Sequence, residues 1–173
     1  MSNGDFSRSV FVNCPFTPDY REFLQAILFV ILRLGFRPRI ASDESDSGDQ
    51  RIDKIKRLIR ECRHGIHDLS LNIAAKKGEP ARMNMPYELG IDLGARWYGP
   101  SPLDRKVTLI LEKERGSVKK ALTDLAGVDL RSYGGSVDIL IREIRAHFHA
   151  FLIGELGRAP MDFPTHDAIW DDW

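Results

Sequence analysis

SVFVNCPFTPDYREFLQAILFVILRLGFRPRIAS, residues 9–42, is the stretch that decides the fold. Residues 9–13 form a short apolar run, which is typical of a buried strand. Two prolines then delay any helix until Asp19, which can cap it, and the apolar stripe that follows predicts a deeply buried helix up to Leu34. Gly35 is a typical residue for the end of such a helix.

Residues 36–42 predict a second strand, at an edge or entry position because Pro38 lacks a backbone N–H group. The alternation of strand and helix continues along the chain. The predicted elements are a helix from Asp49 to Cys62, a strand at 64–70, a helix at 85–98, a strand at 106–112, a short helix at 116–127, a strand at 128–135 and a helix at 136–156. Strands that alternate with helices predict a parallel sheet covered on both faces.

The composition is that of an ordinary globular protein. The 173 residues favour one domain, and 25 basic residues balance 25 acidic ones, so the formal net charge gives no general attraction to nucleic acid or to an anionic membrane. A basic face on the helix at 49–62 leaves RNA binding as a minor alternative. No apolar run is long enough to span a membrane, and the first residues do not resemble a signal peptide. We expect a cytoplasmic protein, with nucleic acid and membrane unlikely as partners.

The last residues differ in composition from the rest. We expect an α/β domain at residues 1–155 and an acidic, aromatic tail at 156–173, which contains two tryptophans and four aspartates. The tail can lie across the body of the domain or engage a partner. The simplest expectation is an extended tail, packed loosely through its aromatic side chains.

The candidate site follows from a general rule of parallel α/β sheets, in which ligands bind beyond the carboxyl ends of the strands. The segments that reach this edge should converge on one crevice. They supply the candidate ligand-binding residues Asn13, Cys14, Pro15, Phe16, Ser47, Arg51, Ser70 and Asn84, and the candidate catalytic residues Asp68 and Glu88.

Glu88 has two interpretations. A carboxylate in the first turn of a helix is favoured by the helix dipole, by about 0.3–1 kcal/mol. Alternatively, Glu88 points into the crevice at which its helix starts. The second interpretation expects Asp92, four residues on, to pair outward with Arg96, while Leu89, Leu93 and Trp97 form the buried stripe.

Other chemistries are weaker. Cys14 has no base fixed near it by sequence, so a role as nucleophile is not favoured. His64 and His67 are three residues apart on a predicted strand and should face opposite sides, so we expect no metal site. Ser47 and Arg51 flank a helix start that could hold a phosphate, although the segment is not a Walker loop.

Three segments together resemble a known superfamily. VFVNCPF (10–16), HDLS (67–70) and MPYELGIDLGAR (85–96) resemble the first strand and turn, the third strand end and the glutamate-bearing helix of nucleoside 2-deoxyribosyltransferase-like proteins and TIR domains. The resemblance covers roughly residues 9–150. It implies a three-layer, flavodoxin-like α/β fold with five parallel strands and helices on both faces. Bacterial TIR-like proteins of this kind include NAD-cleaving effectors of antiviral defence.

The resemblance implies an enzyme that cleaves an N-glycosidic bond, either an NAD(P) or nucleoside glycohydrolase or a deoxyribosyltransferase-like enzyme. Glu88 would be the catalytic carboxylate, Asp68 would bind a ribose hydroxyl or position the base, and Phe16 would stack on the base. No cofactor is implied, since NAD would be the substrate. A nucleotide-like small molecule is the expected partner, and a homo-oligomer is a candidate assembly. The first turn is Asn-Cys-Pro-Phe rather than Gly-Pro-Phe, and the aromatic-serine strand end of TIR domains is absent. The substrate therefore stays open between NAD, a nucleoside and a nucleotide bound without turnover by a sensing or assembly module.

Overall fold

The computed structural model of the chain describes residues 3–41, 50–71 and 83–173 and contains one parallel sheet. Its strands are β1 (Ser9–Asn13), β2 (Arg37–Arg39), β3 (His64–Asp68), β4 (Val107–Glu112) and β5 (Arg131–Ser132). They are ordered β2-β1-β3-β4-β5, and every neighbouring pair is parallel. This is the flavodoxin-like order, so the predicted fold class is confirmed. The proline-containing strand, β2, lies at an edge, as expected.

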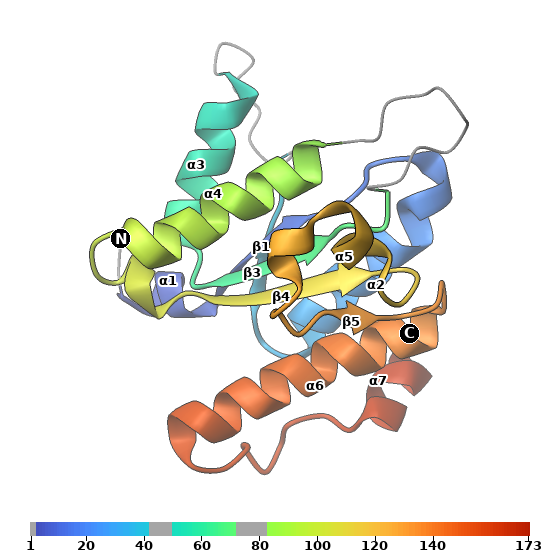
Figure 1. Cartoon of the computed structure of the whole chain (residues 1–173). Helices are drawn as coiled ribbons and strands as arrows, with labels where there is room; N and C mark the ends of the chain where they lie inside the picture. Colours follow the sequence, from blue (N-terminus) through green and yellow to red (C-terminus); the bar gives the residue numbers. More distant parts are fainter. Residues whose placement is uncertain (1–2, 42–49, 72–82) are drawn as a thin grey trace.

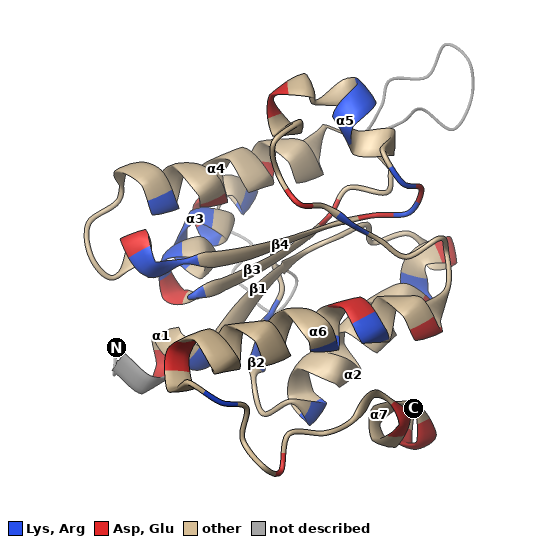
Figure 2. Cartoon of the chain, turned by 60° about the horizontal axis from the view of Figure 1, so that its bottom comes forward, with Lys and Arg blue, Asp and Glu red and all other residues tan. Residues whose placement is uncertain are grey.

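Helices cover both faces of the sheet (Figure 1). They are α1 (Asn3–Arg8), α2 (Arg21–Arg33), α3 (Arg51–Glu61), α4 (Asn84–Tyr98), α5 (Ser117–Ala121), α6 (Val137–Leu156) and α7 (His166–Asp172), with single 3₁₀ turns at Pro18–Tyr20, Leu103–Arg105 and Thr123–Leu125. Figure 2 shows α3 and α4 on one side of the strands and α2 and α6 on the other. The helices α1 and α7 were not predicted, and the expected helix start at Asp49 lies outside the described residues.

The alternation of side chains along β1 explains the three layers. Val10 and Val12 belong to the core that α2 and α6 close, whereas Phe11 packs on the opposite face with Ile55 and Leu58 of α3. All five residues of β1 are buried, which is the expected state of a central strand with helices on both sides.

The C-terminal segment lies across the body of the domain. Thr165 caps α7 by accepting a hydrogen bond from the backbone N–H of Ala168, and Ile169 is fully buried in the core of α2 and α6. Asp172 pairs with Arg33 of α2 at 2.8 Å. The expectation of an extended, loosely packed tail is therefore wrong for residues 166–172. Within the described residues, no helix is both long and apolar enough to cross a membrane.

We expect Ile169→Ala to lower the free energy of unfolding by about 2–5 kcal/mol, because it removes buried methyl groups and leaves a cavity. Ile153→Ala is the matched control, since that isoleucine on α6 is 42% exposed; it should cost less than about 1 kcal/mol. Urea denaturation of both variants measures the difference. Equal costs would show that α7 contributes little to the stability of the fold.

Candidate functional site

A cavity of about 310 Å³ lies at the carboxyl edge of the sheet. The end of β1 and the following turn form one part of its wall, and the starts of α3 and α4 form the rest. The residues that line it are Asn13, Cys14, Pro15, Phe16, Arg51, Asn84, Met85 and Glu88. Most of the predicted site residues therefore converge, as expected for a parallel sheet. Asp68 and Ser70 do not line the cavity, and Ser47 lies outside the described residues.

Glu88 faces this cavity and is only 5% exposed. It is the fifth residue of α4, whose first turn contains no acidic residue, and the dipole effect is confined to the first turn. Among the described residues, its cationic partner is Arg51, whose Nη2 atom lies 3.7 Å from Oε1 and whose side chain is mostly exposed. Burial raises the pKa of the Glu88 carboxyl, and the charge of Arg51 opposes this shift. The helix-start explanation thus loses its basis, and the carboxylate is held at the cavity.

Asp92 does not pair outward with Arg96, so that expectation is wrong. Asp92 is fully buried; its Oδ2 atom lies 3.2 Å from His67 Nε2 and accepts a hydrogen bond from Thr108 Oγ1 at 3.2 Å. Trp97, expected to be buried, is 64% exposed. The helix α4 is therefore rotated so that its acidic residues, rather than Trp97, face the protein.

A buried lysine offsets the cost of burying Asp92. Lys106 Nζ lies 2.9 Å from Asp92 Oδ1 and donates hydrogen bonds to the backbone carbonyls of Ile59, at 2.8 Å, and Cys62, both at the end of α3. Burial alone would raise the pKa of the Asp92 carboxyl. The hydrogen bond from His67 and the positive charge of Lys106 outweigh burial and lower the pKa to about 2.

Gly65 makes room for this cluster. A Cβ atom at position 65 would lie 2.5 Å from Asp92 Oδ2 and 2.9 Å from His67 Nε2, closer than such atoms approach one another. Any side chain there would displace both groups, so the close approach of α4 to β3 requires glycine.

Asp68 points toward the opposite face of the sheet, where α2 and α6 pack. Its Oδ2 atom accepts a hydrogen bond from the hydroxyl of Tyr20, and its Oδ1 atom accepts one from the backbone N–H of Ser70 at 2.8 Å. Burial raises the pKa of the Asp68 carboxyl, and these hydrogen bonds counteract the rise. In this structure Asp68 and Ser70 belong to one hydrogen-bonded turn, in which Asp68 is buried and Ser70 is half-buried, and their predicted contacts with a ligand stay predictions.

The structure also bears on Cys14 and on the two histidines of β3. Burial raises the pKa of the Cys14 thiol, with the negative charges of Asp68 and Glu88 adding to the effect, so the thiol stays protonated and is a poor nucleophile. His64 and His67 do face opposite sides of β3. His64 packs among phenylalanine rings of the α6 side, and His67 contacts Asn13 and Asp92 on the α4 side.

Sequence reasoning missed Met85 and Lys106. Met85 lines the cavity, and its carbonyl oxygen accepts a hydrogen bond from Asn13 Nδ2 at 2.9 Å. Met85 stands beside the predicted residue Asn84, so its proximity to the crevice is visible in the sequence. Lys106 has no such signal, since its partners are up to 47 residues away.

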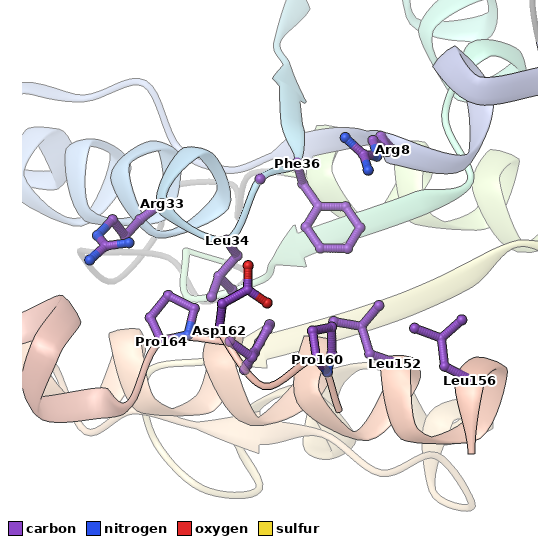
Figure 3. A pocket seen from close by; sticks show the side chains of 11 residues that line it. Arg8, Arg33, Leu34, Phe36, Leu152, Leu156, Pro160, Asp162 and Pro164 are labelled. Atoms are coloured by element: carbon purple, nitrogen blue, oxygen red, sulfur yellow. The ribbon is translucent and has the colours of Figure 1, made fainter. Parts of the chain in front are cut away.

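A second cavity, of about 490 Å³, lies at the other edge of the sheet. Figure 3 shows Arg8 and Arg33 at opposite sides of it, with Asp162 between them. Arg8 immediately precedes β1 and Phe36 immediately precedes β2, so this cavity is at the amino ends of the strands. It contains none of the predicted site residues, and the smaller cavity at the carboxyl edge remains the candidate site.

Comparison with known proteins supports the fold. No family model and no curated protein matches the chain. Among solved structures, the chain is similar to the TIR domains in the structure of the activated Roq1 resistosome directly recognizing the pathogen effector XopQ. The TM-score is 0.57 and the identity 15%, over 82% of this chain and 99% of that one. The chain therefore has a TIR-like fold, and the likeness gives no support to the deoxyribosyltransferase side of the resemblance.

We expect Lys106→Met to destabilise the protein by about 3–5 kcal/mol at pH 7, because Asp92 would stay buried without its cation. Arg105→Met is the control at the neighbouring exposed position and should cost less than about 0.5 kcal/mol. Urea denaturation gives both values.

The pH dependence supplies a second readout of the same variant. The folded-state pKa of Asp92, about 2, lies below its unfolded value of roughly 3.9. Its contribution to stability is therefore present above about pH 4 and is lost as the pH falls toward 2. The difference in free energy of unfolding between wild type and Lys106→Met should therefore be smaller at pH 3 than at pH 7. A difference that does not depend on pH would contradict the ion pair between Lys106 and Asp92.

Proposed function

We propose that this protein cleaves the N-glycosidic bond of NAD or a related nucleotide, with Glu88 as the carboxylate that acts on the sugar. One observation carries the proposal: a nearly buried carboxylate forms part of the wall of a cavity at the carboxyl edge of a TIR-like sheet. Structural side chains at such a position are normally apolar or fully paired, whereas the only cation within 4 Å of Glu88 among the described residues is the exposed Arg51.

The chemistry suits a carboxylate without a strong acid beside it. When the bond between nicotinamide and ribose breaks, the bonding electrons leave with the ring and neutralise its positive charge, so the leaving group needs no proton. Positive charge develops on the sugar as an oxocarbenium ion, and a nearby carboxylate stabilises it. Water then adds to the anomeric carbon and releases a proton, giving ADP-ribose and nicotinamide.

The other cavity residues support this orientation. Phe16 is 45% exposed at the cavity and offers a ring on which a base can stack. Arg51 at the start of α3 offers a guanidinium group to a phosphate, which would also draw it away from Glu88. The volume of about 310 Å³ is at the lower end of the roughly 300–1,000 Å³ range of ligand pockets. It suits the base and ribose of one nucleoside half of the substrate.

The resemblance to NAD-cleaving bacterial effectors extends the proposal to antiviral defence. In that role, loss of cellular NAD would be the output of the protein. Phage infection of bacteria that express wild-type protein or Glu88→Gln, with NAD measured in extracts, tests this part of the proposal.

We expect Glu88→Gln to reduce release of nicotinamide from NAD by at least about 100-fold, because it removes the charge that stabilises the transition state. Chromatography of the products measures the rate. Glu114→Gln, at an exposed position outside the cavity, is the matched control and should keep wild-type activity. Thermal unfolding of both variants excludes a folding defect. Activity of Glu88→Gln near the wild-type level would refute the proposal.

We also expect the wild-type rate to fall as the pH is lowered, because the reaction needs the ionised carboxylate. Burial raises the pKa of Glu88, so the acid limb should lie at higher pH than for an ordinary glutamate. A rate profile from pH 4 to 8 measures it. A limb at or below the usual range of glutamate would contradict the assignment.

A second candidate is a module that binds a nucleotide without cleaving it and assembles with further copies of itself. The pairing of Glu88 with Arg51 favours it, because a neutralised carboxylate is a binding group rather than a catalyst. Calorimetric binding of NAD to the wild-type protein, with no base released from NAD or nucleosides, would select this candidate. Sedimentation with and without NAD would then report assembly.

A further inference from the structure

The side-chain amide of Asn13 has a fixed orientation. Its nitrogen Nδ2 lies 2.9 Å from the carbonyl oxygen of Met85, which can only accept a hydrogen bond. The same nitrogen lies 3.0 Å from His67 Nδ1. An amide nitrogen carries two hydrogens and no free electron pair, so both contacts are donations. Turning the amide over would place its oxygen against the oxygen of Met85.

The position of the His67 proton follows from this geometry. Because Nδ1 accepts from Asn13, the ring carries its proton on Nε2, which faces Asp92 Oδ2 at 3.2 Å. Asp92 is held in turn by Lys106 at 2.9 Å. Four buried side chains, Lys106 just before β4, Asp92 of α4, His67 of β3 and Asn13 of β1, are thus linked in a row that ends in the wall of the candidate site.

Among the residues that the structure describes, these contacts leave Asn13 with one polar side-chain atom without a partner. Both amide hydrogens are engaged, and within the described ranges no donor is bonded to Oδ1. An oxygen of this kind can only accept, so a ligand group that meets it must be a hydroxyl or an N–H group. A carbonyl or phosphate oxygen at the same place would be repelled.

We propose that Asn13 is a specificity-determining residue whose Oδ1 atom accepts a hydrogen bond from a ribose hydroxyl. The positioning residues that hold Asn13 in this orientation are His67, Asp92 and Lys106. Asn13 and Glu88 line the same cavity, so a sugar whose anomeric carbon lies at Glu88 has its ring hydroxyls near Asn13. The site then favours ribose over deoxyribose. The identity of the ligand rests on the proposed function, and the selection for a donor rests on the hydrogen bonds alone.

Binding is measured by calorimetry in the Glu88→Gln background, which prevents turnover. The probes are NAD and its 2′-deoxy and 3′-deoxy analogues in the nicotinamide ribose. At least one analogue should bind about 10- to 100-fold more weakly than NAD, because a hydroxyl that satisfies Oδ1 is missing. Asn13→Ala should bind all three within about threefold of one another. Equal binding of the three probes without the Asn13 substitution would overturn the inference.

Two isosteric substitutions separate positioning from a merely structural role. His67→Asn places a carbonyl oxygen near the Nδ1 position and keeps the acceptor for Asn13, whereas His67→Gln places an amide N–H near the Nε2 position and keeps only the donor to Asp92. We expect discrimination between NAD and the weaker analogue to persist in His67→Asn and to fall to within threefold in His67→Gln. Thr108→Val, which touches Asp92 and not Asn13, is the control and should keep discrimination. Loss of discrimination in both His67 variants, or in neither, would overturn the positioning role.

The outcomes separate this inference from the proposed function. Discrimination in binding without any release of nicotinamide by the wild type refutes the glycohydrolase and leaves the inference standing. Release of nicotinamide by the wild type, together with equal binding of NAD and its two deoxy analogues, refutes only the inference. No binding and no cleavage of NAD overturns both.

Discussion

One buried ammonium group fixes the geometry on which the candidate site depends. Lys106 stands just before β4 and directs its Nζ atom to the carbonyls at the end of α3 and to Asp92 of α4. A charge removed from water is tolerated only when such partners surround it, so the end of α3, the rotation of α4 and the start of β4 are set together. The rotation of α4 that brings Asp92 to the lysine also brings Glu88 to the cavity. A structural ion pair on one turn of the helix therefore orients a functional candidate on the previous turn.

The two carboxylates of α4 show how environment separates like groups. Glu88 and Asp92 are four residues apart and both are buried, yet the pKa of one is raised and that of the other is lowered. Asp92 has a buried cation and a histidine N–H within 3.2 Å, whereas Glu88 has a solvent-exposed guanidinium at 3.7 Å. Divergent pKa values in one site are the pattern from which acid, base and electrostatic roles are usually assigned. Here they indicate that Asp92 stays ionised at neutral pH as part of the framework, and that Glu88 is the carboxylate whose ionisation a ligand can alter.

The sequence was sufficient for the features that local patterns encode. The strand–helix–strand pattern of residues 9–42 predicts the parallel sheet, and the strand-end rule predicts that the turn after β1 meets the starts of α3 and α4. The face of α4 could not be predicted, because the groups that stabilise buried Asp92 lie on other strands and carry no local signal. The direction of the Asp68 side chain could not be predicted for a different reason: the strand-end rule selects the edge of the sheet, and alternation along β3 sends this side chain to the side opposite His67.

The requirement for glycine at position 65 limits how the region around Asp92, His67 and Lys106 can evolve. Its Cβ position is filled by Asp92 and His67, so a larger residue is accommodated only after those groups have moved or been replaced. Replacing Asp92 first leaves the buried ammonium of Lys106 without its counter-charge, and replacing Lys106 first leaves the carboxylate of Asp92 without its counter-charge. Replacing this ion pair by apolar residues one substitution at a time therefore passes through a variant of lower stability. The cluster residues Gly65, Asp92 and Lys106 should therefore change together in evolution. A residue at the cavity rim such as Phe16 lies outside the cluster and can be replaced singly, which would change the ligands that the cavity accepts.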